Sequence, residues 1–292
     1  MGRDVSRETS SSHAMLASMT RSRTIAIANQ KGGVGKTTTA INLGASLAAA
    51  DLRVLVVDLD PQGNCTSGLG IEKEALEIST YHVLIQGTDP LLAICSTELD
   101  SLDLLPSNRE LTGATIELLE VEEREFRLAQ ALNPLRDHYD FILIDCPPTL
   151  GILTLNALVA ADSLLIPIQC EYFALEGLSE LMGTLARVQQ TFNPRLRIEG
   201  VLLTMYDERL NLSGQILQNI RGHLGDRVFQ IVIPRNVRLA ESPSFGKPIL
   251  LYDARSKGAD TYLQLAREIL AKLSPSEERH SYSSGQSIGV AL

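Results

Sequence analysis

Apolar residues of this chain gather in short runs that are separated by longer segments of mixed polarity. Seven of these runs are rich in β-branched residues and are nearly continuous in apolar character. They span residues 24–29, 53–60, 102–107, 139–146, 163–169, 198–206 and 228–234. Runs of this length without polar alternation predict strands that are buried on both faces of a sheet.

Segments with the spacing of amphipathic helices separate most of these runs. The clearest cover residues 37–50, 122–135, 212–223 and 259–273. This alternation predicts an α/β fold, a mostly parallel twisted sheet of about seven or eight strands with helices on both faces. In such sheets, ligands bind beyond the carboxyl ends of the strands.

We expect one domain from Arg23 to Leu273, because no linker rich in Pro, Gly and Ser divides this part of the chain. Residues 1–22 and 274–292 are poor in apolar side chains, which favours a disordered leader and a disordered tail. No apolar run reaches the roughly 18 residues of a membrane span, and the first residues lack the apolar segment of a secretory signal.

The four cysteines lie far apart in the sequence, and no pair has C-x-x-C spacing. This spacing argues against a zinc or iron–sulfur site within one chain and suits a reducing cytoplasm. The net charge of −9 argues at first against nucleic acid as a partner. However, residues 195–257 hold ten Lys and Arg against six Asp and Glu, which indicates a localised basic face.

Residues 29–39 read NQKGGVGKTTT and contain most of a phosphate-binding loop. The usual pattern is G-x-x-x-x-G-K-[ST]. Gly35, Lys36 and Thr37 supply its end, whereas Gln30 stands where the first glycine is expected and a second lysine, Lys31, follows it. One lysine is enough to hold the phosphates of a nucleotide, so the second requires a separate explanation.

The loop lies where phosphate chemistry needs it, between a predicted strand and a predicted helix. Its backbone N–H groups converge on phosphate oxygens, and the helix N-terminus adds the positive end of its dipole. The residues between strand and helix are Gly32, Gly33, Val34 and Gly35. Lys36 can reach the β- and γ-phosphates, the Thr37 hydroxyl can bind Mg²⁺, and Thr38 is placed for a further phosphate contact. The sequence therefore predicts a site for ATP and Mg²⁺.

Three aspartates end predicted strands and complete this site. An acidic residue at a strand end beside a phosphate loop holds Mg²⁺, usually through water, and Asp145 is the candidate for that role. Asp58 and Asp60 are two residues apart along one strand, and the turn at Pro61 follows them. We expect these two aspartates to have different roles.

The motifs KGGVGKTT, DLDPQGN and IDCPP together resemble the deviant Walker A ATPases of the ParA/MinD class. Further segments, QCEYFALEGL, EGVLLTMYDERLNLS and VIPRNVRLAESPSFGKPILLYD, are similar to the ParA/Soj branch that partitions chromosomes and plasmids. The resemblance covers about residues 23–273. It implies a P-loop NTPase fold and slow ATP hydrolysis that a ParB-like partner stimulates.

The resemblance also implies a role for the second lysine. In this family, Lys31 corresponds to a signature lysine that reaches across an ATP-sandwich homodimer and contacts the phosphates held by the other subunit. Asp60 corresponds to the residue that positions the attacking water, and Asp58 supports Mg²⁺ from behind its direct ligands. Pro234 and Asn236 match the segment that cradles adenine.

The same branch binds double-stranded DNA without sequence preference when it is dimeric with ATP. Arg209 and Arg238 match the arginines implicated in that binding, and Lys247 and Arg221 are weaker candidates. The segment DERLN departs from the D-x-R-T-N of many relatives, because Leu210 replaces a hydroxyl and Glu208 adds negative charge. The resemblance thus implies a cytoplasmic, nucleoid-associated protein.

Four alternatives remain open from the sequence. A MinD-like membrane ATPase needs a basic amphipathic C-terminal helix, whereas residues 259–273 are followed by a polar stretch. An iron–sulfur carrier of the same superfamily needs a cysteine pair. A non-enzymatic nucleotide-binding adaptor would not need Lys36, Asp60 and Asp145. A related branch that positions protein cargoes is poorly separated by sequence.

Overall fold

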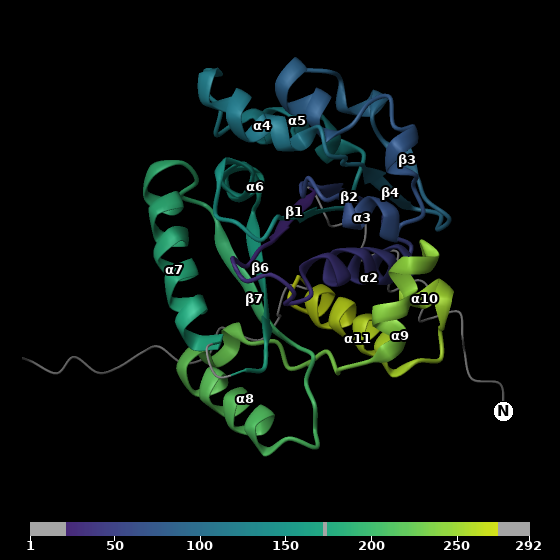
Figure 1. The fold of residues 1–292 in the computed structure, drawn as a ribbon. Helices are drawn as coiled ribbons and strands as arrows, with labels where there is room; N and C mark the ends of the chain where they lie inside the picture. The colour runs from purple at the N-terminus through teal and green to yellow at the C-terminus, as the bar shows by residue number, and fades with distance from the viewer. Residues whose placement is uncertain (1–21, 172–173, 274–292) are drawn as a thin grey trace, which may run out of the picture.

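The computed structural model describes residues 22–171 and 174–273, so the expectations for residues 1–21 and 274–292 lie outside the described residues. Figure 1 shows one twisted sheet with helices on both of its faces, as the sequence predicts. The strands are β1 (Arg23–Ile27), β2 (Val54–Asp58), β3 (Cys95–Ser96), β4 (Leu102–Leu105), β5 (Phe141–Asp145), β6 (Ser163–Gln169) and β7 (Arg197–Thr204). Their order is β3-β4-β2-β5-β1-β6-β7, and all neighbours are parallel except β3 and β4.

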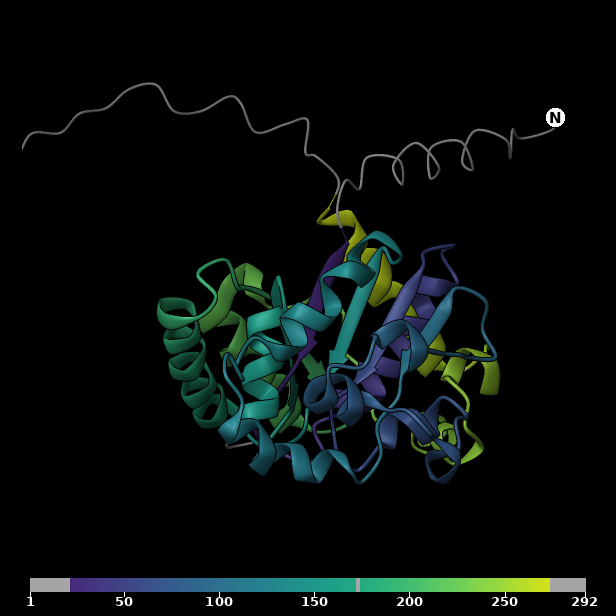
Figure 2. The same cartoon turned by 90° about the horizontal axis from the view of Figure 1, so that it is seen from above.

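The helices form the two outer layers of the domain (Figures 1 and 2). They are α2 (Lys36–Ala48), α3 (Asn64–Gly68), α4 (Leu111–Glu117), α5 (Arg127–Leu132), α6 (Ile152–Ala160), α7 (Ala174–Thr191), α8 (Asn211–Leu224), α9 (Val237–Glu241), α10 (Ile249–Tyr252) and α11 (Lys257–Ala271). One apolar core joins α4 to α8 with one face of the sheet, and a second core joins α2 and α11 with the other. Within the described ranges, no helix has the length and apolar character to cross a membrane.

The continuous apolar runs are explained by this two-faced burial. In β5, Ile142 and Ile144 pack into the core with α5 and α6, whereas Phe141 and Leu143 pack into the core with α2 and α11. Successive side chains of a strand point to opposite faces, so a strand covered on both faces must be apolar at every position. The pattern therefore predicts the central strands correctly.

The strand order turns at β1, which lies between β5 and β6. On one side of β1 the sheet is built from β5, β2 and β4, and on the other side from β6 and β7. At such a reversal of strand order, the connections leave a crevice beyond the carboxyl ends of the strands. In the register of the sheet, Ile27 is opposite Asp145, and Asp145 is opposite Asp58. The phosphate loop and two of the predicted aspartates are thus brought to one point.

The predicted strand 228–234 is wrong, because this segment makes only two isolated bridges, one to Val201 of β7 and one to Tyr206 beyond its end. Phe229 N–H donates to the Val201 carbonyl at 3.0 Å, but the N–H groups of Gln230 and Ile231 donate to the Glu268 carboxylate of α11 at 2.9 and 3.1 Å. The Glu268 side chain therefore takes the hydrogen bonds that a neighbouring strand would otherwise accept from this segment. The seventh strand is instead the short antiparallel β3, which no apolar run marks.

The predicted helix 122–135 is also too long. Glu123 has a φ of 52°, which a continuing right-handed helix cannot include, and α5 begins only at Arg127. A 3₁₀ turn at Pro134–Asp137 follows the helix. The other three predicted helices correspond to α2, α8 and α11 within two residues at each end.

Candidate nucleotide-binding site

The phosphate loop connects β1 to α2 and opens into a pocket of about 330 Å³. Gly33 and Gly35 have φ values of 75° and 88°, in the left-handed region that favours glycine, and Gly35 is the N-cap of α2. The lining residues are Gly32, Gly33, Gly35, Lys36, Thr37, Thr38, Asp60, Gln62, Asn64, Pro148 and Met205. A glycine-rich turn at the start of a 13-residue helix is a site suited to phosphate.

Lys36 is buried at the base of this loop and 7% exposed. Its Nζ donates to the Lys31 carbonyl at 3.1 Å, so the side chain curls under the loop. Burial lowers the pKa of Lys36, and the negative charges of Asp145 and Asp60 oppose this effect. A buried ammonium held in this place is suited to phosphate oxygens, which would accept hydrogen bonds from Nζ in addition to the Lys31 carbonyl.

Asp145 ends β5 and is fully buried. Neither of its carboxylate oxygens has a hydrogen-bond partner among the described residues, and the Thr37 hydroxyl is near enough to favour the charged form without meeting hydrogen-bond geometry. Burial and the neighbouring Asp58 charge raise the pKa of Asp145 well above its usual value. A buried carboxylate without partners normally pairs with a cation or binds water. Asp145 and Thr37 therefore fit a hydrated Mg²⁺ ion.

Asp58 has a different environment at the end of the neighbouring strand β2. Its Oδ2 accepts hydrogen bonds from the N–H and the hydroxyl of Thr66 at 2.8 and 2.7 Å, and its Oδ1 accepts from Asp60 N–H at 3.1 Å. Burial raises the pKa of Asp58 to about 6. Because both of its oxygens are occupied by protein donors, Asp58 organises the β2 end and the start of α3.

Asp60 lines the phosphate pocket, so its surroundings differ from those of Asp58. Its Oδ1 accepts a hydrogen bond from Gln62 N–H at 2.9 Å, and its carbonyl accepts one from the Ser107 hydroxyl at 2.8 Å. These contacts hold the carboxylate at the pocket wall while leaving Oδ2 without a recorded partner in the described part of the chain. Asp60 can therefore accept a hydrogen bond from a water molecule in the pocket.

A second pocket of about 250 Å³ adjoins the first and shares Gly35, Thr38 and Met205 with it. Pro234 and Asn236, which the resemblance expects to cradle adenine, both line this pocket, and Asn236 Oδ1 accepts a hydrogen bond from Leu239 N–H at the start of α9. Its apolar lining and its size are suited to a nucleotide base.

Sequence reasoning missed Met205, which lines both pockets. Met205 has a φ of 51°, an uncommon value for a residue with a side chain. It follows β7 at the point where Thr204 Oγ1 donates to the Val34 carbonyl of the phosphate loop at 2.8 Å. No motif marks Met205, because its role depends on a backbone turn and on contact with a loop far away in the sequence.

The second lysine lies at the rim of the site. Lys31 forms an ion pair with Glu171, and its neighbour Gln30 donates to Glu180 of α7. The side chain of Lys31 is 46% exposed and does not line the phosphate pocket of its own chain. In the described structure, the two lysines of the loop therefore point to different surroundings.

The four candidate DNA-binding residues are not brought together into one cluster. Arg209 and Arg221 lie at α8, whereas Arg238 and Lys247 lie near α9 and α10, on the other side of the domain in Figures 1 and 2. Each has a partner within the chain. Arg209 pairs with Asp207, Arg238 with Glu241 and Asp253, and Lys247 with Glu98, and Arg221 donates to the Gln230 carbonyl.

A parallel sheet with a phosphate loop at its switch point, a buried carboxylate and an adjoining base pocket define a P-loop nucleotide-binding protein. The AAA domain family (AAA_31) matches residues 22–198. The chain is 54% identical over 257 residues to the chromosome partitioning protein ParA of Myxococcus xanthus, covering 88% of this chain and 91% of that protein. It is 56% identical over 247 residues to the sporulation initiation inhibitor protein Soj of Bacillus subtilis, covering 85% and 98%.

Among solved structures, the chain is similar to a protein described as cobyrinic acid a,c-diamide synthase from Mycobacterium smegmatis, with bound ATP analogue and magnesium. The TM-score is 0.75 at 39% identity, covering 84% of this chain and 93% of that one. Identity is higher to the partitioning proteins and extends over nearly their whole length. The chain belongs to the ParA/Soj family of chromosome-partitioning ATPases.

Proposed function

We propose that this chain moves DNA by a cycle of ATP-dependent dimerisation, non-specific DNA binding and partner-stimulated hydrolysis. The observation that carries the proposal is the pair of lysines in one phosphate loop. Lys36 is buried under the loop, and Lys31 is exposed at its rim, so only Lys36 lines the phosphate pocket of its own chain. A lysine at the rim can instead serve a second subunit.

The nucleotide would occupy both pockets, with its base beside Pro234 and Asn236 and its phosphates at the loop. Loop N–H groups and Lys36 would bind the phosphate oxygens, and Thr37 and Asp145 would hold Mg²⁺ directly or through water. Bound Mg²⁺ neutralises charge on the β- and γ-phosphates. Asp60 would orient the water that attacks the γ-phosphorus as the bond to the β-phosphate oxygen breaks.

The dimer is supported by the surroundings of Gly32. A Cβ atom added at Gly32 would meet only Pro148 Cβ, at 3.9 Å, and the φ of Gly32 is not positive, so this chain alone does not require glycine there. A glycine at an exposed loop tip instead permits close approach of a second copy. Lys31 would then leave Glu171 and contact the partner subunit's ATP, as an arginine finger does in trans. Hydrolysis removes the phosphate that joins the two subunits.

Two arginines would carry most of the DNA binding. Arg209 and Arg238 are exposed and can contact phosphates without reading bases, with Arg221 and Lys247 as weaker contributors. Such contacts release counterions, so affinity should fall steeply with salt. This function places the protein in the cytoplasm on the nucleoid, where a ParB-like partner would stimulate ATP hydrolysis and release it from DNA.

The test is binding to a random-sequence DNA duplex with ATP, with ADP and without nucleotide, across a salt series. We expect binding with ATP only, with a negative slope of log affinity against log salt. Dimerisation is measured in parallel by light scattering. If the protein dimerises with ATP but binds no DNA at low salt, the DNA function is wrong, and liposome and protein-cargo binding become the next assays.

A further inference from the structure

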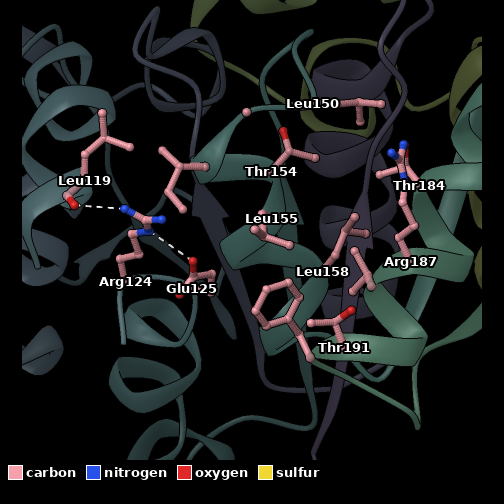
Figure 3. Close-up of a pocket in the computed structure, with 14 residues that line it drawn as sticks. Leu119, Arg124, Glu125, Leu150, Thr154, Leu155, Leu158, Thr184, Arg187 and Thr191 are labelled. Carbon is pink, nitrogen blue, oxygen red and sulfur yellow. Dashed lines mark hydrogen bonds and ion pairs between the residues drawn. The ribbon is translucent and has the colours of Figure 1, made fainter. Parts of the chain in front are cut away.

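One large cavity of the described chain lies away from the nucleotide pockets. It is a groove of about 670 Å³ between α6, α7 and the segment 119–125, and it shares no lining residue with the two nucleotide pockets (Figure 3). Its apolar wall includes Leu155 and Leu158 of α6 and Val188 of α7, and Phe192 follows α7. Phe192 packs edge-to-face on Phe126 with ring centroids 6.1 Å apart.

Exposed apolar side chains extend this wall outside the groove. Leu119 lines the groove and is 57% exposed, and Ile116 of α4, three residues earlier, is 71% exposed. Scattered apolar residues on a surface are ordinary. Leu119 and Ile116 are exposed close together in sequence, and Leu119 lines the groove, which is typical of a binding site for another protein.

The rim of the groove carries excess positive charge. Arg124 pairs with Glu125 at 3.0 Å and donates to the Leu119 carbonyl, so its charge is compensated. Arg187 is exposed, and its recorded hydrogen bond goes to the neutral Thr184 hydroxyl at 3.4 Å. No ion pair of Arg187 is found among the described side chains, which do not include those of residues 172–176 and 212. A carboxylate on the occupant would complement Arg187.

The walls also select the form of the occupant. The groove is lined by side chains of α6 and α7 and contains no free strand edge. The edge of the sheet at β7 lies elsewhere and is covered by residues 228–233, which bond to the β7 backbone. An extended peptide in an apolar groove would leave its N–H and C=O groups without partners. A helix satisfies these groups internally and presents an apolar stripe to a groove of this kind.

Two short connections join the groove to the nucleotide site. Pro148 lines the phosphate pocket, and Leu150, two residues later, lines the groove. On the other wall, Glu180 of α7 accepts a hydrogen bond from Gln30 of the phosphate loop, and Thr184, one helical turn further, lines the groove. A protein bound in the groove would therefore contact both segments that flank the phosphates.

From these observations we propose that the α6–α7 groove binds an amphipathic helix of the hydrolysis-stimulating partner, with its apolar stripe against Leu119 and Leu155 and an acidic residue on Arg187. This proposal rests on the proposed function, because it assigns a docking surface to the ParB-like partner. Through Leu150 and Thr184, the bound helix would restrict the loops around the phosphates and favour hydrolysis.

Two charge-changing variants and two matched controls test the groove. Arg187→Glu and Leu119→Asp alter the rim and the mouth. Arg267→Glu and Leu92→Asp make the same changes at exposed positions that line neither the groove nor the basic region 195–257, and Leu92 is 68% exposed. The probe is the full-length ParB-type protein of the same genome on its own DNA site. Its affinity and its stimulation of ATP turnover are measured for all four variants and the unaltered chain.

We expect about tenfold weaker partner binding for Arg187→Glu and Leu119→Asp, a loss of about 1.4 kcal/mol each. Basal ATP turnover and ATP-dependent DNA binding should stay unchanged in both variants. The two control variants should bind the partner and respond to it as the unaltered chain does. Stimulation equal to that of the unaltered chain would overturn the groove proposal while leaving the function intact. Altered self-association without the partner would make the groove an interface between copies and overturn it too. Failure of the unaltered chain to bind DNA with ATP would instead overturn the proposed function, and this proposal with it.

Discussion

The phosphate loop and the basic region 195–257 meet their ligands under opposite conditions. At the loop, Lys36 and Asp145 are buried, and Asp145 has no hydrogen-bond partner among the described residues. In the basic region, Arg209 and Arg238 are exposed and already paired with carboxylates of the same chain. One site therefore has unsatisfied groups that a ligand can complete, and the other has charges that a ligand must compete for.

Because of this difference, the geometry of the phosphate loop indicates its ligand more strongly than the geometry of the basic region does. A buried polar group without a partner costs free energy unless water, an ion or a ligand binds it. The position and chemistry of such a group therefore indicate what kind of ligand binds there. An exposed ion pair contributes little and forms readily. The geometry at the loop thus supports a nucleotide with Mg²⁺, whereas DNA binding by the basic region depends on the similarity to ParA and Soj.

The largest effect is expected from Lys36→Ala. Removing a buried ammonium from the phosphate site should weaken ATP binding about 100-fold or more, because a charge-assisted contact is lost where water cannot replace it. Calorimetric titration with ATP and Mg²⁺ measures this. The control is Lys257→Ala, which removes a lysine whose side chain is 63% exposed and pairs with Glu208. Normal ATP affinity in Lys36→Ala would contradict the loop assignment.

Asp60→Ala should next lower ATP turnover about 100-fold while leaving ATP binding nearly intact, because a positioned acid or base contributes about that much or more to rate. The variant should accumulate as an ATP-bound dimer, visible by light scattering. Asp137→Ala, at an exposed position away from both nucleotide pockets, should behave as the unaltered chain. Rapid turnover in Asp60→Ala would remove it from the water-positioning role.

Much of the nucleotide site could be predicted because its signals are local. The motif at Gly35, Lys36 and Thr37 is contiguous, and a continuous apolar run places Asp145 at a strand end. The structure then adds what spacing cannot show, namely that Asp58 is bonded to Thr66 and that Asp145 is not bonded to any described residue.

The failures of the sequence analysis have a common physical cause, which is contact between distant segments. Residues 228–234 have the composition of a strand, but Glu268 from the last helix bonds two of their N–H groups. Met205 lines both nucleotide pockets because its backbone adopts a left-handed conformation, which the residues around it do not predict. The groove beside α6 depends on three segments, and no one of them has a motif.

Gly32→Val sharpens the comparison, because it should leave the buried half of the loop intact and affect only its exposed tip. We expect ATP affinity within about threefold of normal. Dimerisation should weaken about tenfold or more, because overpacking at a close contact commonly costs about 1–3 kcal/mol. Light scattering with ATP measures dimerisation. Gly222→Val is the matched control, because a Cβ there meets nothing within 4 Å. An ATP-dependent dimer of normal strength would argue against a subunit interface at Gly32.

In the basic region, Arg238→Glu should weaken ATP-dependent DNA binding about tenfold and reduce the salt slope by about one, because one phosphate contact is lost and a like charge is added. Dimerisation with ATP should be unchanged. Arg267→Glu makes the same charge change on the exposed surface of α11, outside the basic region. Equal losses in both variants would mean that net charge, and not Arg238 itself, controls DNA affinity.

The smallest effect tests whether the ion pairs of the basic region restrain DNA binding. Arg209 contacts both carboxylate oxygens of Asp207, through Nε at 2.8 Å and Nη2 at 2.7 Å. Asp207→Asn keeps an oxygen for the Arg209 N–H and removes the charge, so DNA affinity at low salt should rise about two- to threefold.

Asp226→Asn gives the same change in net charge at an exposed position of the basic region and separates the two explanations, whereas Glu208 pairs with Lys257. A gain in Asp207→Asn alone would show that freeing Arg209 matters, whereas equal gains would show a general effect of charge. Arg209 lowers the pKa of Asp207 to about 2, so Asp207 stays ionised at every pH from about 5 to 8. The ratio of the two affinities should therefore be constant over that range, and a ratio that changes with pH would require a different titrating group at the DNA-binding surface.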